Sequence, residues 1–268
     1  MTLGELLELT PTGADTFSGV GYEYSWGGLY GGHIVAQALR AAAFTVEEGF
    51  LPHSLRAYFI RRGDNTRHVD YDVDRIRDGR SFCTRRVVAR QSGDAILNLE
   101  ASFQIAEETF EISPMESVDD FPAPEALPDA SWMPFLERRN IEMDDAYATA
   151  RGGLGRTAAW MRTTTRLDGE LLNRCALAFL SDDLPTESVV NADLRFRKAS
   201  DEGRRFSASL DHTIWFHRPV AAHEWHLYEM SCVNYTNGRG LAQGFVFAVD
   251  GTHVATIAQE TLVRIRPE

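Results

Sequence analysis

One order of predicted elements occurs twice along these 268 residues. In the first half, a β-prone stretch at residues 16–25 precedes an apolar helix that is predicted from residue 31 to about residue 47. The apolar arc of this helix is wide and rich in alanine, so we expect the helix to be largely buried. Four β-prone segments then follow without another helix, at residues 54–61, 68–76, 82–90 and 95–104.

The second half repeats this order. A predicted strand at residues 157–166 precedes an apolar helix at residues 170–180. Four further strands are predicted at residues 206–217, 225–235, 241–249 and 253–264. Two short sequence matches link the halves, residues 58–61 with residues 215–218 at an offset of 157 and Gly93 with Gly251 at an offset of 158. The chain is therefore predicted to contain a duplicated unit.

A proline-rich segment separates the two units. It carries Pro114, Pro122, Pro124, Pro128 and Pro134, mixed with Asp and Glu. Proline has no backbone N–H and fits neither a helix interior nor a central strand. We therefore predict a first domain at residues 1–110, a linker at residues 111–135 and a second domain at residues 136–268.

The order of elements within each unit predicts the fold. One strand, one long helix and then four antiparallel strands is the plan of the hotdog fold, in which a sheet wraps around a buried helix. The sequence therefore predicts an α+β protein made of two fused hotdog folds. A single copy would leave sheet edges open, so the two copies are expected to pair. We also expect protomers to assemble through their sheets, as a homodimer or a homotetramer.

The charge of the chain limits its partners. There are 39 acidic and 27 basic residues, which give a formal net charge of -12. A nucleic-acid partner requires a concentrated basic face, so this class of partner is not expected. An anionic small substrate is compatible with the charge, because a local arginine cluster can bind phosphate in an acidic protein.

The N-terminal residues and the cysteines indicate the compartment and the cofactors. The N-terminus lacks the basic and apolar regions of a signal peptide, and no apolar run is long enough to span a bilayer. We therefore expect a cytoplasmic protein without a membrane span. Cys83, Cys175 and Cys232 fit neither a metal site nor a disulfide framework, and no metal or other cofactor is expected.

Several ordered motifs are similar to those of one enzyme family. They are GGHIVAQAL at residues 31–39, YFIRRGD at 58–64, RDGRSF at 77–82, ASFQ at 101–104 and DHTIWFHRP at 211–219. In this order, the sequence resembles the acyl-CoA thioesterase II family over nearly its whole length. The exceptions are the proline-rich segment and residues 138–155. The resemblance implies hydrolysis of fatty acyl-CoA to free fatty acid and CoA, within fatty acid metabolism.

The resemblance also implies a catalytic set made of an aspartate, a serine or threonine, and a glutamine. The matching positions in this chain are Asp182, Ser209 and Gln259. Asp183 follows Asp182 directly, so the sequence leaves the identity of the aspartate open by one residue.

These residue types suit the chemistry of thioester hydrolysis, which needs a nucleophile, a base and donors for the oxyanion. A buried carboxylate such as Asp182 can deprotonate a water once burial raises its pKa. Ser209 and Gln259 carry both donor and acceptor atoms and can hold the same water. Gly31 and Gly32 open the first helix, where bare backbone N–H groups would let a substrate carbonyl approach closely. This hypothesis requires Gly31 to lie close to Asp182.

Other residues are candidates for substrate binding. His212, within the DHTIWFHRP motif, is expected to contact substrate in the cleft or to hold strand and helix together. The phosphates of CoA could be met by arginines that we expect on the surface, namely Arg61, Arg62, Arg85 and Arg86.

Two other functions are open at this point. Hotdog enoyl-CoA hydratases pair an Asp with a His in one helical segment, and neither predicted helix carries such a pair. A non-catalytic acyl-CoA binding protein would keep the fold without turnover, and the presence of all three expected residue types disfavours it. A serine-nucleophile hydrolase is disfavoured because the chain has no Gly-x-Ser-x-Gly motif.

Overall fold

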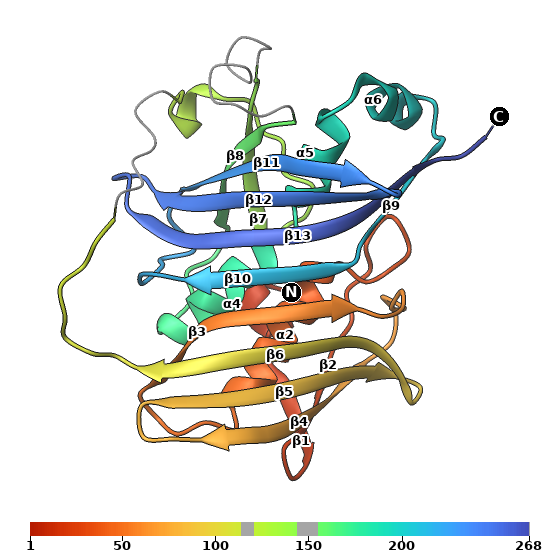
Figure 1. The fold of residues 1–268 in the computed structure, drawn as a ribbon. Helices are drawn as coiled ribbons and strands as arrows, with labels where there is room; N and C mark the ends of the chain where they lie inside the picture. The colour runs from red at the N-terminus through yellow and green to blue at the C-terminus, as the bar shows by residue number, and fades with distance from the viewer. Residues whose placement is uncertain (114–120, 144–154, 268) are drawn as a thin grey trace.

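The computed structural model describes residues 1–113, 121–143 and 155–267. Its central feature is one antiparallel sheet that runs through both halves of the molecule (Figure 1). The strands follow the order β1-β2-β4-β5-β6-β3-β10-β13-β12-β11-β8-β7, with β9 paired to β13. All six strands from β1 to β6 come from the first half of the chain, and the rest come from the second half.

The first half contains a short helix, the long helix α2 and six strands. Their bounds are α1 Leu3–Leu6, β1 Leu9–Gly13, β2 Thr16–Gly19, α2 Gly31–Ala43, β3 Phe50–Phe59, β4 Val69–Asp78, β5 Phe82–Gln91 and β6 Asp94–Ile105. The long helix is predicted to residue 47 but ends at Ala43, and the first β-prone stretch is a strand only over Thr16–Gly19.

The second half repeats the plan with additions. Its elements are η1 Pro124–Ala126, β7 Leu136–Ile141, β8 Thr157–Thr163, α4 Glu170–Leu180, α5 Pro185–Asn191, α6 Leu194–Asp201, β9 Arg205–Ser209, β10 Asp211–Phe216, β11 His226–Thr236, β12 Arg239–Ala248 and β13 His253–Ile265. Helix α4 has the predicted bounds. The strand predicted at residues 206–217 is divided at Leu210, because β9 and β10 pair with different parts of the long strand β13.

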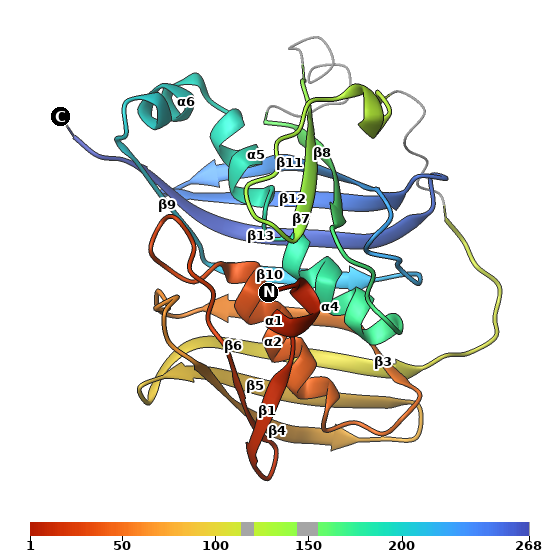
Figure 2. The ribbon, with the colours of Figure 1, turned by 180° about the vertical axis from the view of Figure 1, so that it is seen from behind.

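The helices α2 and α4 pack against each other in the concave side of the sheet (Figure 2). Eleven of the thirteen residues of α2 are buried, as the alanine-rich pattern predicted. The two helices approach closely at Gly32, where an added Cβ would lie 2.1 Å from the Phe179 carbonyl oxygen. The Tyr30 hydroxyl donates a hydrogen bond to the same oxygen at 2.9 Å. Glycine at position 32 is therefore required for this helix crossing.

Strands β3 and β10 join the two halves. Arg56 of β3 lies opposite Thr213 of β10, and these positions differ by 157 residues, which is the offset of the sequence match. Each half therefore meets its own counterpart at the seam. The two halves of this continuous sheet, each wrapped around one long helix, confirm the predicted α+β double-hotdog fold. The predicted domain limits at residues 111–135 stay a prediction, since part of that segment lies outside the described residues. Within those residues, no helix is long and apolar enough to cross a membrane.

Candidate active site

The carboxylate of Asp182 lies at the point where the end of α4 meets the start of α2. Ser181 caps α4 in a helical conformation, and the chain then turns. This turn brings Asp182 to the N-terminus of α2, where the Gly32 N–H donates to Asp182 Oδ2 at 2.9 Å. The free N–H groups and the dipole at a helix N-terminus favour a negative charge.

Ser209 and Gln259 complete a cluster around this carboxylate. The Ser209 hydroxyl donates to Asp182 Oδ1 at 3.1 Å, and Gln259 Nε2 donates to Ser209 Oγ at 2.9 Å. Ser209 ends β9 and Gln259 lies in β13, and pairing of these two strands sets their separation. The structure therefore brings together the three residues that the sequence singled out.

Burial changes the acidity of Asp182. Only 7% of the residue is exposed. Burial raises the pKa of Asp182 to about 7, although hydrogen bonds from Ser209, Gln259 and the Gly32 amide act in the opposite direction. A carboxyl group with this pKa exchanges its proton near neutral pH, as a general base must.

Asp183 has different partners. Its carboxylate accepts from Trp132 Nε1 at 3.0 Å and from Arg138 Nη1 at 2.7 Å. Arg138 also pairs with Glu187, so the guanidinium bridges two acidic groups. Asp183 is therefore held in an ion pair, whereas Asp182 contacts Ser209. Neither Trp132 nor Arg138 was singled out from the sequence, because both lie in or beside the proline-rich segment.

The two glycines at the start of α2 occupy different environments. A Cβ added at Gly31 would lie 2.5 Å from Asp182 Oδ2, so Gly31 meets the requirement of proximity to Asp182. The Gly32 N–H already donates to Asp182. The Gly31 N–H makes no hydrogen bond with any described residue, and it remains available to a ligand.

His212 lies behind the cluster. It is fully buried, with Nδ1 at 2.5 Å from Gln259 Oε1 and Nε2 at 2.8 Å from Ser181 Oγ. Both ring nitrogens are thus used by protein groups. Direct contact between His212 and substrate stays a prediction, and this geometry gives it no support.

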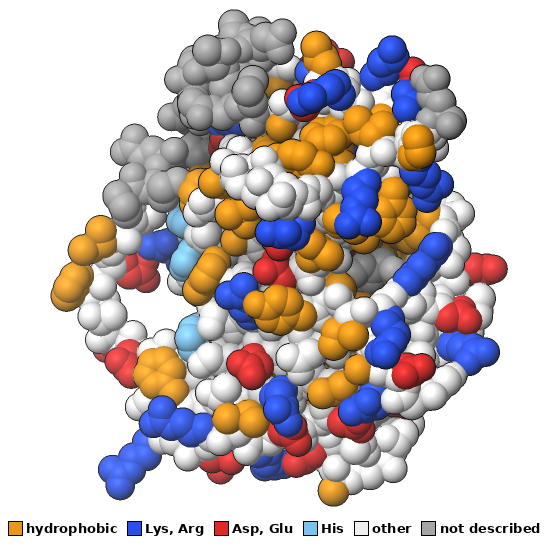
Figure 3. Space-filling view, turned by 45° about the vertical axis from the view of Figure 1, so that its right-hand side comes forward, with side chains coloured by type: hydrophobic (Ala, Val, Ile, Leu, Met, Phe, Trp, Pro, Cys, Tyr) orange, Lys and Arg blue, Asp and Glu red, His pale blue; other side chains and the backbone are white. Residues whose placement is uncertain are grey.

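A cleft of about 670 Å³ reaches Asp182 from the surface. Trp26, Tyr30 and Trp132 form an aromatic wall of this cleft, and Arg197 and Arg205 line it too. Neither of these arginines has an ion-pair partner among the residues described. Figure 3 shows that hydrophobic and basic side chains gather together on the upper part of one face of the molecule.

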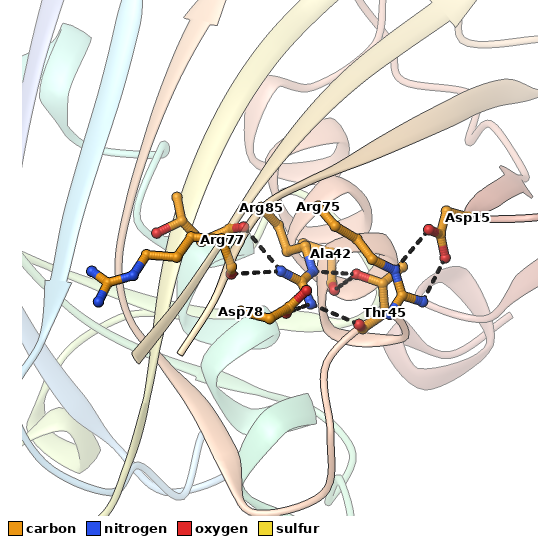
Figure 4. A network of polar contacts seen from close by, with 8 residues as sticks. Asp15, Ala42, Thr45, Arg75, Arg77, Asp78 and Arg85 are labelled. Atoms are coloured by element: carbon orange, nitrogen blue, oxygen red, sulfur yellow. Dashed lines mark hydrogen bonds and ion pairs between the residues drawn. The ribbon is translucent and has the colours of Figure 1, made fainter. Parts of the chain in front are cut away.

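The arginines proposed for CoA from the sequence have other surroundings. Arg85 is not on the surface, because only 1% of it is exposed, and this expectation was wrong. Its guanidinium donates to Thr45 Oγ1, to the carbonyl oxygens of Thr45 and Arg77, and to Asp78 (Figure 4). Arg61, Arg62 and Arg86 are exposed, but the cleft at Asp182 is lined by other residues.

The described residues contain no group of three or more His, Cys, Asp or Glu side chains that could hold a metal ion. The cluster itself presents a buried carboxylate, a hydroxyl, an amide and a helix N-terminus.

Comparison with known proteins gives two family matches. The acyl-CoA thioesterase N-terminal domain matches residues 23–104, and the acyl-CoA thioesterase C-terminal domain matches residues 115–263. Together these matches cover both halves of the chain.

Individual relatives match over almost the full length. Acyl-CoA thioesterase 2 of Haemophilus influenzae is 33% identical, over 97% of this chain and 96% of that protein. The crystal structure of acyl-CoA thioesterase II TesB2 from Mycobacterium marinum is 34% identical, covers 98% of both chains and superposes with a TM-score of 0.85. A protein from Alicyclobacillus acidocaldarius with a hot dog fold shares 21% identity, 98% coverage of both chains and a TM-score of 0.80, and it supports the fold alone.

Proposed function

This chain belongs to the acyl-CoA thioesterase II family and is an acyl-CoA thioester hydrolase, and we propose that it attacks the thioester with a water held by Asp182, Ser209 and Gln259. The observation that carries this proposal is the contact of the Ser209 hydroxyl with a buried Asp182 carboxylate whose pKa is raised to about 7. The chain would then release CoA and a free acid without a covalent acyl-enzyme.

In the proposed reaction, Asp182 accepts a proton from the water as the water oxygen attacks the thioester carbonyl. Ser209 and Gln259 orient the water, because their hydrogen bonds to each other fix the hydroxyl beside Asp182 Oδ1. The tetrahedral intermediate then collapses, the C–S bond breaks and the CoA sulfur leaves with the proton that Asp182 had accepted, which restores the carboxylate.

The N–H of Gly31 is the proposed donor to the oxyanion. It lies at the N-terminus of α2 and has no partner among the described residues, whereas the Gly32 N–H holds the base in place. The two amides would thus have different roles: the Gly31 N–H would stabilise the charge of the intermediate, and the Gly32 N–H would orient Asp182.

The cleft above Asp182 is the proposed site for the substrate. Its aromatic wall of Trp26, Tyr30 and Trp132 offers an apolar surface to the thioester and its neighbouring groups. Arg197 and Arg205 offer charge without an acidic partner in the described structure, and we assign them to the phosphates of CoA.

The direct test is release of free thiol from acyl-CoAs of several chain lengths by the wild type and by Asp182→Asn. We expect the variant to lose about 10²- to 10⁴-fold in kcat, because a general base contributes this much. Asp183→Asn is the matched comparison, since its carboxylate is buried beside Asp182 but pairs with Arg138. A variant Asp182→Asn with wild-type activity would overturn the base assignment, and a wild type without thiol release on any chain length would support the binding-protein alternative.

The pH profile is a second test of the same assignment. The base must be ionised, so kcat/KM should rise with pH up to a pKa near 7 and then become constant. Asp183→Asn should keep this profile. A profile that is flat between pH 6 and pH 8 would contradict the role of Asp182.

A further inference from the structure

A chain of buried hydrogen bonds continues from the catalytic cluster into the protein. Ser181 Oγ lies 2.8 Å from His212 Nε2, and His212 Nδ1 lies 2.5 Å from Gln259 Oε1. Gln259 Nε2 donates to Ser209, which donates to Asp182. Since Ser181 directly precedes Asp182, these groups close a ring that begins and ends at the same turn.

The direction of the hydrogen bonds between His212, Gln259 and Ser209 follows from which atoms of His212 and Gln259 face each other. Burial lowers the pKa of His212 to about 4, so its imidazole is neutral and carries a single N–H at physiological pH. The neighbour of Nδ1 is a carbonyl-type oxygen, which can only accept, so the hydrogen is on Nδ1. Nε2 then carries the lone pair, and the Ser181 hydroxyl, which donates to the Ala178 carbonyl oxygen at 3.0 Å, shares its hydrogen with Nε2 at 2.8 Å.

The orientation of the Gln259 amide decides whether the cluster can work. With Oε1 facing His212, Nε2 faces Ser209 and donates to it, which leaves the Ser209 hydrogen for Asp182. With the amide reversed, its oxygen would accept the Ser209 hydrogen, and Asp182 Oδ1 would lose its donor. An N–H at His212 Nδ1 excludes the reversed orientation, because two donors would then face each other.

We propose that His212 is a positioning residue, whose Nδ1–H fixes the Gln259 amide so that Ser209 can donate to Asp182. This inference rests on the proposed function and adds a residue that does not touch the substrate. Ser181 holds the other side of the imidazole, since its Oγ lies 2.8 Å from Nε2.

The first half of the chain provides an internal comparison. Leu55 occupies the position that corresponds to His212 at the offset of 157, and its partner across β3 and β6 is Ala101. Both residues are buried, so an apolar pair fills the same place in the half without the cluster. The fold therefore needs no histidine at the corresponding position of the first half, where a leucine is buried.

The test uses the full chain with His212→Leu, His212→Asn and Gln259→Ala, alone and combined. We expect His212→Leu to lower kcat about 10- to 100-fold with little change in KM, because misorientation affects the reacting geometry more than binding. Asn keeps a side-chain N–H near the position of Nδ1, so His212→Asn should recover part of the loss. In the Gln259→Ala background, His212→Leu should have no further effect, since the group that it orients is gone.

A control separates positioning from general stability. His226 is also a buried histidine, but it bonds to the Glu224 carbonyl oxygen, and His226→Leu should leave kcat unchanged. Full activity in folded His212→Leu, or additive losses in the double variant, would overturn the inference. If Asp182→Asn were also fully active, the proposed function would fail, whereas an inactive Asp182→Asn beside an active His212→Leu would overturn the inference alone.

Discussion

The two halves of the molecule end their central helices in opposite ways. Two residues after α4 ends, Asp182 extends to the N-terminus of α2 and accepts from Gly32 and Ser209. Two residues after α2 ends, Thr45 turns back on its own helix, donates to the Ala42 carbonyl oxygen and accepts from Arg85 (Figure 4). The same position thus holds a carboxylate that contacts the N-terminus of the other helix in one half. In the other half it holds a hydroxyl that hydrogen-bonds to its own helix.

The N-termini of the two long helices also differ in how closely other residues approach them. Gly31 is so close to Asp182 that an added Cβ would collide with it, whereas a Cβ added at Gly169, before α4, would have no described atom within 4 Å apart from its chain neighbours. The polar pair His212 and Gln259 has the apolar counterpart Leu55 and Ala101. The fold thus creates two equivalent places, and only one of them carries the residues of the proposed catalytic cluster. Burying a titratable carboxylate is expensive, so the other half gains stability by avoiding it.

Asp182→Asn should remove this difference in cost and make the protein more stable at pH 8. The pKa of Asp182 rises from 3.8 to about 7 on folding, which corresponds to a penalty of at most roughly 4 kcal/mol. The unfolded chain loses this proton near pH 4 and the folded chain near pH 7, so the penalty grows between these values and is complete above them. Urea unfolding at pH 8 and at pH 5 measures it.

The stabilisation by Asp182→Asn should shrink as the pH falls from 8 to 5. Asp193→Asn is a control, because Asp193 is hydrogen-bonded to Arg195 and the pKa of its carboxyl is lowered to about 2. That variant should not gain stability at pH 8. If Asp182→Asn were less stable than the wild type at pH 8, the buried Asp182 carboxylate would not carry the expected cost in free energy of unfolding.

Gly31→Ala should damage the equipped site while leaving the fold in place. The added methyl group would displace Asp182 or Phe59, whose ring lies 2.9 Å from the Cβ position. We expect a loss of about 100-fold in kcat/KM, the scale of a displaced catalytic group. Thiol-release kinetics and circular dichroism measure the two consequences.

Gly32→Ala sharpens this result, because its methyl group would meet the backbone of Phe179. This variant should lose folded protein, whereas Gly31→Ala should lose activity alone. Normal activity in Gly31→Ala would contradict this prediction, because it would show that the N-terminus of α2 can accept a methyl group without displacing Asp182.

Arg85→Met should reveal that the corresponding place in the first half is structural. The variant leaves the Thr45 and Arg77 carbonyl oxygens without their donor, which should lower the free energy of unfolding by about 2 kcal/mol. The kcat of the folded variant should stay within about twofold of the wild type, because the site at Asp182 draws nothing from Arg85. Arg86→Met is the control, since Arg86 forms an exposed ion pair with Asp74. A large loss of kcat in Arg85→Met would contradict the purely structural role that we assign to this place in the first half.

The sequence was sufficient where local pattern and motif agree. The bounds of α4 and the pairing of the two halves could be predicted from it, and the family motifs singled out Asp182, Ser209 and Gln259, which lie together in the structure. Other elements gave weak signals, because α5 has seven residues and α6 has eight, too few for a clear helical period.

The surroundings of the site depend on packing between distant segments. Trp132 and Arg138 reach Asp183 across 51 and 45 residues of sequence, and no local pattern indicates that contact. Arg85 was predicted to be a surface residue, because the pattern of polar and apolar residues in this strand does not distinguish it from its neighbour Arg86. The direction of hydrogen bonds through His212 follows only from which oxygen faces which nitrogen.

The seam between β3 and β10 also has a consequence for biosynthesis. The ribosome completes β3 and β6 long before it reaches β10, so the nascent first half presents one free edge of β3 to solvent or to other chains. Such an edge is a template for pairing with a wrong strand, including the β3 of another nascent chain. The same hydrogen-bonding groups that join the halves in the finished protein are therefore open to wrong pairing while the protein is being made.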